Sequence, residues 1–181
     1  MLSGPMDYTP GVFQLNNFRY DSPETKNIDK GAIVPSTIGK ELALYVVYYS
    51  PMQMAADLPK HYSKHMDAFA FIKNVPVDWS ERKILNSEFR EYVSMARKDK
   101  YSENWYVGGI TNENERDLKI DFSFLESGKE YTMKMYLDTQ NTHWKENPME
   151  YQITEREVSS NDNIDIYLAP GGGFAIEIIA K

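Results

Sequence analysis

Residues 130–137 read Glu-Tyr-Thr-Met-Lys-Met-Tyr-Leu, and apolar side chains occupy every second position at Tyr131, Met133 and Met135. This period of two is typical of a β-strand with one buried face. Comparable runs recur along the second half of the chain, separated by turn sequences rich in Gly, Asn and Asp. They predict seven strands, at 90–97, 104–111, 116–122, 130–137, 150–158, 163–169 and 173–180. Short strands at this spacing predict an antiparallel β-sandwich over residues 76–181.

The first 75 residues have a different pattern. Apolar side chains at helical spacing predict a helix at 37–50, and Pro51 ends it. A short apolar run at 51–57 predicts a buried strand, and 60–73 predict a second helix. Helix, strand and helix in succession are the repeat of a parallel α/β fold. We therefore expect residues 1–75 to be the last βα elements of an incomplete (β/α)8 barrel, with the helix at 37–50 exposing an apolar face.

Charge supports a boundary near residue 75 and excludes some partners. The net charge is −7, and residues 1–75 carry equal numbers of acidic and basic groups, so residues 76–181 hold the whole excess. An acidic chain without a basic stripe argues against nucleic-acid binding. The chain has no cysteine, no run of the roughly 20 apolar residues that a membrane span needs, and no signal peptide at its first residues.

Two motifs suggest ligand sites but fit them poorly. Gly171-Gly172-Gly173 is followed by a strand pattern, whereas a phosphate loop leads into a helix, so we predict a turn. His61 and His65 have the spacing of a helical metal chelate, but no third ligand accompanies them. We predict that these histidines lie on a solvated helix face and that the chain holds no metal.

Carboxylates that could line a sugar pocket are Asp7, in an extended segment, and Asp57, at the end of the predicted buried strand. In barrel enzymes the working residues lie at the carboxyl ends of strands. The alternative for Asp57 is a helix cap, because Pro59 follows it. Neither residue can be chosen over the other acidic residues as catalytic by its type alone.

Tryptophans are the candidates for sugar stacking on the β-domain. Trp105 and Trp144 are the main candidates, with Trp79 and Tyr106 beside them. The alternative is packing in a core or between domains, because aromatic side chains bury large areas. A free-standing carbohydrate-binding or interaction module is therefore the alternative to a part of an enzyme.

Five ordered blocks resemble glycoside hydrolase family 97, the α-glucosidase and α-galactosidase family. The blocks are Gly-Pro-Met-Asp-Tyr-Thr-Pro-Gly at 4–11, Leu-Ala-Leu-Tyr-Val at 42–46, Tyr-Ser-Pro-Met-Gln-Met-Ala-Ala-Asp-Leu-Pro at 49–59, Trp-Tyr-Val-Gly-Gly-Ile-Thr at 105–111 and Leu-Ala-Pro-Gly-Gly-Gly-Phe-Ala at 168–175. The resemblance implies the end of a catalytic TIM barrel at 1–75 and the C-terminal β-sandwich from 76, a domain linked to barrel packing and oligomerisation.

The same resemblance implies the chemistry of the whole enzyme. Members of the family are calcium-dependent and exported, as in the periplasm of Bacteroidetes, and they cleave α-linked oligosaccharides. Their catalytic carboxylates and calcium ligands precede the block at 4–11, so none is assigned to a residue here. We therefore expect this chain to bind no calcium and to be inactive alone, and to take part in a homo-oligomer through its sandwich.

Overall fold

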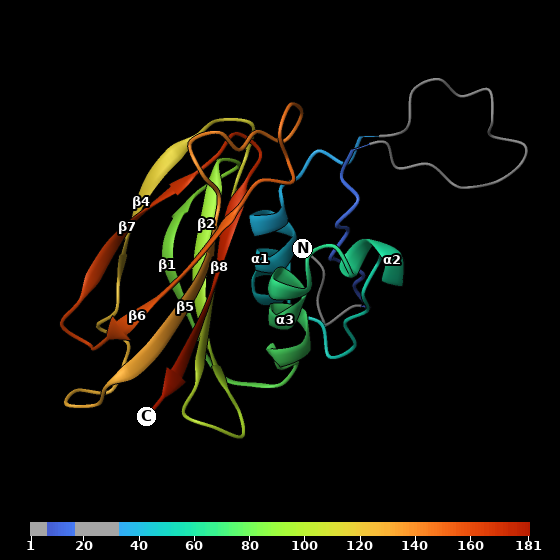
Figure 1. Ribbon diagram of the computed structural model, residues 1–181. Coiled ribbons are helices and arrows are strands. Elements are labelled where there is room, and N and C mark those ends of the chain that lie inside the picture. The colour runs from blue at the N-terminus through green and yellow to red at the C-terminus, as the bar shows by residue number, and fades with distance from the viewer. Residues whose placement is uncertain (1–6, 17–32) are drawn as a thin grey trace, which may run out of the picture.

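The computed structural model describes residues 7–16 and 33–181, which form a β-sandwich with helices on one side (Figure 1). The elements are α1 (Ile38–Val47), α2 (Pro59–Tyr62), α3 (Met66–Asn74), β1 (Trp79–Glu88), β2 (Tyr92–Asp99), β3 (Trp105–Thr111), β4 (Arg116–Asp121), β5 (Tyr131–Leu137), β6 (Gln152–Val158), β7 (Asn163–Leu168) and β8 (Gly173–Ala180). None of the described helices is long and apolar enough to cross a membrane.

Two antiparallel sheets make up the sandwich. The larger has the order β1-β2-β3-β8-β5-β6, and β4 pairs with β7 in the smaller. Their facing side chains form one apolar cluster, with Val107 and Ile176 from the large sheet and Ile120 and Ile166 from the small one. The alternating apolar positions of the sequence are the ones that point into this layer. The expected antiparallel β-sandwich is confirmed.

Strand β1 is the strand that the sequence pattern missed. It lies at the edge of the large sheet, and the side chains of residues 80–84 are all exposed. An edge strand whose side chains are mostly in water has little reason to alternate apolar and polar residues. Period-two patterning therefore predicts the other seven strands and misses β1.

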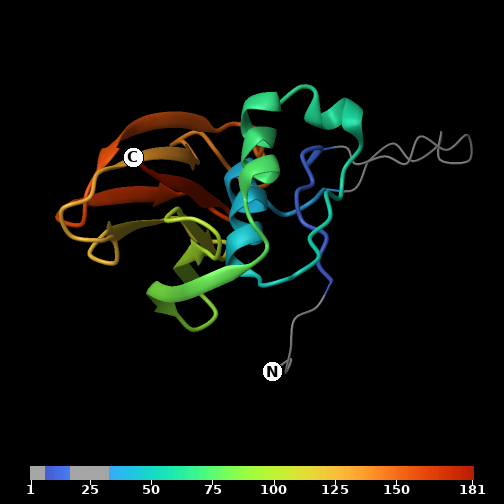
Figure 2. The ribbon, with the colours of Figure 1, turned by 90° about the horizontal axis from the view of Figure 1, so that it is seen from below.

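Helix α1 covers the outer face of the large sheet (Figure 2). Its side chains Ile38, Leu42 and Val46 are fully buried, and they share a cluster with Tyr106 and Tyr136 of the sheet. The expectation that this helix leaves an apolar face exposed is therefore wrong. The partner that the first 75 residues lack is supplied by the sandwich itself.

Glycines allow α1 to approach the sheet closely. A Cβ on Gly108 of β3 would lie 2.8 Å from the carbonyl oxygen of Ala43, and a Cβ on Gly39 of α1 would overlap the carbonyl oxygen of Gly173. Both neighbours are backbone atoms, which cannot rotate away. At Gly39 and Gly108 the backbone of the helix therefore lies against the backbone of the sheet, with no side chain between them.

A buried carboxylate fixes the same junction. Asp138 follows β5 and accepts hydrogen bonds from the backbone N–H groups of Gly173 (2.7 Å) and Ala169 (3.2 Å). Burial raises the pKa of Asp138 to about 7, although the Thr37 hydroxyl and these amides favour the charged form. The carboxylate thus ties the connection between β7 and β8 to the end of β5, next to Gly39 of α1.

The elements predicted around residues 51–73 need correction. In place of a strand at 51–57, the structure has one parallel bridge between Tyr8 and Gln53. Backbone hydrogen bonds flank it, from Met54 N–H to the Tyr8 carbonyl and from Ala56 N–H to the Pro10 carbonyl. The pairing is limited to this isolated bridge and its flanking bonds, which is too short to form a regular strand. The helix expected at 60–73 is divided into α2 and α3 at residues 63–65.

Candidate functional site

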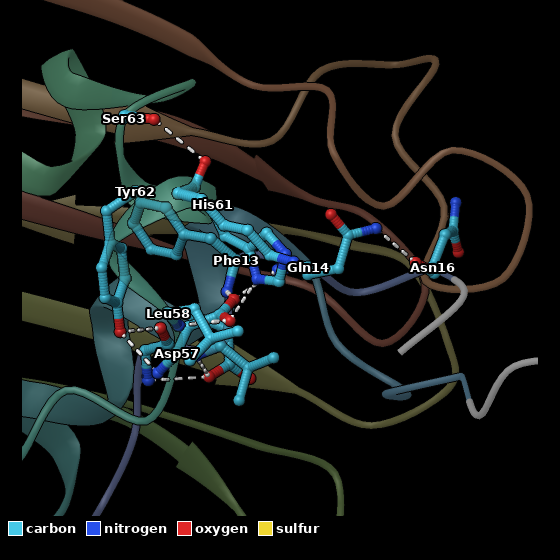
Figure 3. Close-up of polar contacts among 12 residues, drawn as sticks. Phe13, Gln14, Asn16, Asp57, Leu58, His61, Tyr62 and Ser63 are labelled. Carbon is cyan, nitrogen blue, oxygen red and sulfur yellow. Dashed lines mark hydrogen bonds and ion pairs between the residues drawn. The ribbon is translucent and has the colours of Figure 1, made fainter. Parts of the chain in front are cut away.

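Asp57 is the candidate pocket residue whose surroundings the structure defines best (Figure 3). Its Oδ2 accepts the backbone N–H groups of Phe13 (2.8 Å) and Gln14 (2.7 Å). Its Oδ1 accepts the N–H of Leu58 (2.7 Å) and lies 2.5 Å from Nδ1 of His61. The side chain is 1% exposed. Each oxygen of the Asp57 carboxylate therefore accepts hydrogen bonds from two donors of the chain.

The pKa of Asp57 reflects this shell of donors. Burial raises it, but the hydrogen bonds from His61 and from the amides of Gln14, Leu58 and Phe13 outweigh the burial, and the pKa lies below its usual value. A charged carboxylate with four donors is a positioning group. Asp57 therefore holds residues 13–14 against the segment that precedes α2. The N-cap of α2 is Leu58 and no side-chain hydrogen bond caps this helix, so the helix cap, the alternative for Asp57, is not what the structure shows.

Tyr62 of α2 extends the network. Its hydroxyl accepts the N–H of Asp57 (2.9 Å) and donates to the carbonyl oxygen of Gly11 (2.8 Å). Its ring stacks on Phe69 and meets the edge of Phe13. The Tyr62 hydroxyl thus joins the backbone of Asp57 to the backbone of Gly11.

Glu41 of α1 binds the adjoining part of the same segment. Its Oε2 accepts the N–H groups of Gly11 (2.9 Å) and Val12 (3.0 Å), and the residue is 5% exposed. Burial raises the pKa of Glu41, and these two bonds oppose the shift. Two carboxylates on different elements therefore hold four consecutive backbone amides, from residue 11 to residue 14.

Sequence reasoning missed Glu41 and Tyr62. Glu41 has a detectable signal, because it lies on the buried face of a helix whose neighbouring positions are apolar. A carboxylate in such a position needs donors from elsewhere in the chain. The aromatic ring of Tyr62 fits an apolar position of its helix, and its residue type gives no sign of the two hydrogen bonds that its hydroxyl makes.

The structure does not bring the two candidate carboxylates together. Asp7 precedes the bridge between Tyr8 and Gln53, whereas Asp57 follows it on the paired segment. Asp7 is exposed and makes no hydrogen bond or ion pair with the described residues. The described part of the chain therefore offers no pair formed by these two acids.

The candidate tryptophans have different surroundings. Trp105 is 4% exposed and packs in the sandwich core, against Phe124. This leaves no open ring face for a sugar, so packing, the alternative for Trp105, is what the structure shows. Trp144 is half-buried and lies against His143 and Gly171. Trp79 is also half-buried, on the opposite, helix-covered side of the large sheet.

The histidines and glycines also have defined places. His61 bonds to Asp57, and Nδ1 of His65 lies 3.2 Å from the Tyr151 hydroxyl, so the expectation of a solvated histidine face is wrong. Within residues 7–16 and 33–181 no group of three or more His, Cys, Asp or Glu could hold a metal ion. Gly171, with φ +68°, forms the predicted turn before β8.

Comparison with known proteins identifies the class to which this sandwich belongs. Residues 78–179 match the family model described as glycosyl-hydrolase 97 C-terminal, oligomerisation. A retaining α-galactosidase of Bacteroides thetaiotaomicron is 35% identical over 98% of this chain, and a probable retaining α-galactosidase of Streptomyces bingchenggensis is 26% identical over 95%. The chain spans about a quarter of the length of these relatives, 25% and 23%.

Solved structures agree with the sequence matches. A glycoside hydrolase family 97 enzyme from Pseudoalteromonas sp. strain K8, in complex with panose, is 40% identical with a TM-score of 0.88. The match covers 99% of this chain and 27% of that enzyme. A β-arabinopyranosidase at 22% identity and a TM-score of 0.74 shares the fold. The chain belongs to glycoside hydrolase family 97, and residues 78–179 are the C-terminal sandwich domain of that family.

Proposed function

We propose that this chain serves as the C-terminal portion of an exported, calcium-dependent α-glycosidase, an α-glucosidase or α-galactosidase that acts on α-linked oligosaccharides. The observation that carries the proposal is the similarity over 98–99% of the chain to about a quarter of such enzymes. In this proposal the calcium and the catalytic carboxylates belong to the catalytic domain. The described residues contribute packing and assembly.

Packing against a catalytic barrel has support in the geometry. The parallel bridge between Tyr8 and Gln53 joins two segments that α1 separates in sequence, which is the arrangement of a βαβ unit. Beyond α1 a run of apolar side chains is exposed: Met52, Met54 and Leu58. Exposed apolar side chains gathered in one run mark an interaction surface. We propose that the remaining strands and helices of the barrel cover them.

The direct test of this proposal is an assay of hydrolysis by the 181-residue chain alone. We expect no turnover of nitrophenyl α-glucoside or α-galactoside, with or without calcium, because Asp57 is saturated with donors and Asp7 has no acidic partner. Asp7→Asn and Asp57→Asn variants serve as matched controls. Turnover that disappears in either variant would place catalysis on that residue and contradict the proposal. Turnover that survives in both would place it elsewhere in this chain.

Self-association through the sandwich is the second part of the proposal, and the tip of the β1–β2 hairpin is its best-supported surface. Phe89 at this tip is 83% exposed. A groove of about 560 Å³ beside it has Tyr48, Val93 and Ile110 in its walls. A knob and a groove on one surface satisfy the requirement of a two-fold interface, in which each copy offers both.

Phe89→Glu is expected to shift the chain toward monomer by tenfold or more in dissociation constant, since it places a charge in an apolar contact. Analytical ultracentrifugation of the 181-residue chain measures this. Tyr101→Glu is the control, because Tyr101 is equally exposed but lies beyond the other end of β2. Equal effects of the two substitutions, or a wild-type chain that stays monomeric at high concentration, would exclude this surface.

A further inference from the structure

Two arginines oppose each other across the edge of the large sheet. Arg82 of β1 lies directly opposite Arg97 of β2 in the strand register. Like charges in this relation destabilise a sheet. Among the described residues no carboxylate forms an ion pair with either guanidinium, although the chain has 27 acidic residues. The arrangement therefore lacks its counter-ion.

The two side chains share a cavity of about 270 Å³. Its walls are formed by Tyr49, Trp79, Ser80, Glu81, Arg82 and Arg97. Arg97 is 6% exposed, and its Nε donates to the carbonyl oxygen of Val46 (2.6 Å) at the end of α1. Its Nη2 lies at the limit of a hydrogen bond to the Val47 carbonyl, and its Nη1 donates to no described residue.

The other residues of the cavity do not supply the missing charge. Glu81 stands opposite Lys98 in the register and forms no ion pair with either arginine. Trp79 also lines the cavity, and its Nε1 is buried without a hydrogen-bond partner among the described residues. The Trp79 and Tyr49 rings lie 6.0 and 5.7 Å from the guanidinium carbon of Arg97. They confine that group without neutralising it.

We propose that this cavity binds a small oxyanion, a phosphate or a carboxylate group, between the guanidinium groups of Arg82 and Arg97. Guanidinium donors match the oxygen spacing of both anions, and the bonds are strengthened by charge and partial burial. The anion removes the repulsion between the arginines. The cavity volume suits a single anionic group with few further atoms.

Anion titration of the whole 181-residue chain tests the site. The NMR signals of the Arg97 Nε–H and the Trp79 indole N–H are followed while sodium phosphate, and separately sodium acetate, replaces sodium chloride at constant ionic strength. We expect saturable shifts at roughly millimolar anion. A response to both anions identifies a general oxyanion site, and a response to one identifies its preferred group. No saturable change with either anion overturns the proposal.

Substitutions of single arginines distinguish anion binding in this cavity from nonspecific attraction of anions to the protein surface. Arg82→Gln should weaken the anion at least tenfold without unfolding the exposed edge strand, and Arg82→Lys should restore part of the affinity. Arg156→Gln is the control, because Arg156 lies on β6, the opposite edge strand of the same sheet. Arg156→Gln that weakens the response as much as Arg82→Gln would mean nonspecific attraction and overturn the proposal.

Discussion

Asp57→Ala should lower the free energy of unfolding by about 3 kcal/mol, because it leaves four donors, three of them in part-buried hydrogen bonds, without an acceptor. The backbone amides of Phe13, Gln14 and Leu58 and the ring of His61 all lose their partner. An unsatisfied buried donor costs about 1–3 kcal/mol, and water that enters the opened site recovers part of the sum. In a domain of this size the melting temperature should fall by roughly 6–12 °C.

Thermal and urea unfolding measure the change, and Asp7→Ala is the matched control. Asp7 is an exposed carboxylate near the same segment and has no partner among the described residues, so its removal should leave stability within about 0.5 kcal/mol. Hydrogen exchange should show residues 11–14 opening in the Asp57 variant while β3 and β8 stay protected. Equal stability of the two variants would mean that Asp57 does not position this segment.

The Asp57 variant also has a defined pH dependence. The pKa of Asp57 is lowered on folding, so its contribution to stability is present above the ordinary Asp pKa of 3.8 and is lost as the pH falls toward the folded value. The difference in unfolding free energy between wild type and Asp57→Ala should therefore shrink on acidification below about pH 4. A constant difference down to pH 2 would contradict the proposed charge on Asp57.

Much of the sandwich could be predicted from the sequence, because a strand with one buried face has apolar residues at every second position. This alternation is present in β5, where Tyr131, Met133 and Met135 point into the core. It is absent from β1, whose side chains are mostly in water. The position of α1 was predicted, but not what covers it. An apolar helix face predicts that some other segment covers the helix, but it does not identify that segment.

The candidate site was only partly accessible to sequence reasoning for the same reason. Asp57 could be singled out by its place after an apolar run, but its role depends on amides more than 40 positions earlier in the chain. Nothing in the local sequence encodes such a pairing. Trp105 shows the reverse case: its residue type fits sugar stacking, and only its burial shows that it packs in the core.

Gly39→Ala should destabilise the chain by about 2 kcal/mol or more, despite the higher helix propensity of alanine. Alanine in an exposed helix position would gain about 1 kcal/mol over glycine. At this position its Cβ would overlap the backbone carbonyl of Gly173 and lie 2.9 Å from Oδ1 of Asp138. Backbone on both sides of the contact prevents local relief, so the helix must move outward from the sheet.

Chemical unfolding and limited proteolysis together reveal this displacement. We expect cleavage within residues 33–75 to accelerate in Gly39→Ala, while β3, β8 and the small sheet stay resistant, because the helix separates from a sheet that keeps its own core. Gly128→Asn is the control, since a Cβ there meets nothing within 4 Å and asparagine tolerates the positive φ of +82°. A Gly39→Ala chain that is more stable than wild type would show that intrinsic helix propensity outweighs the close contact, and α1 would then lie farther from the sheet than the structure places it.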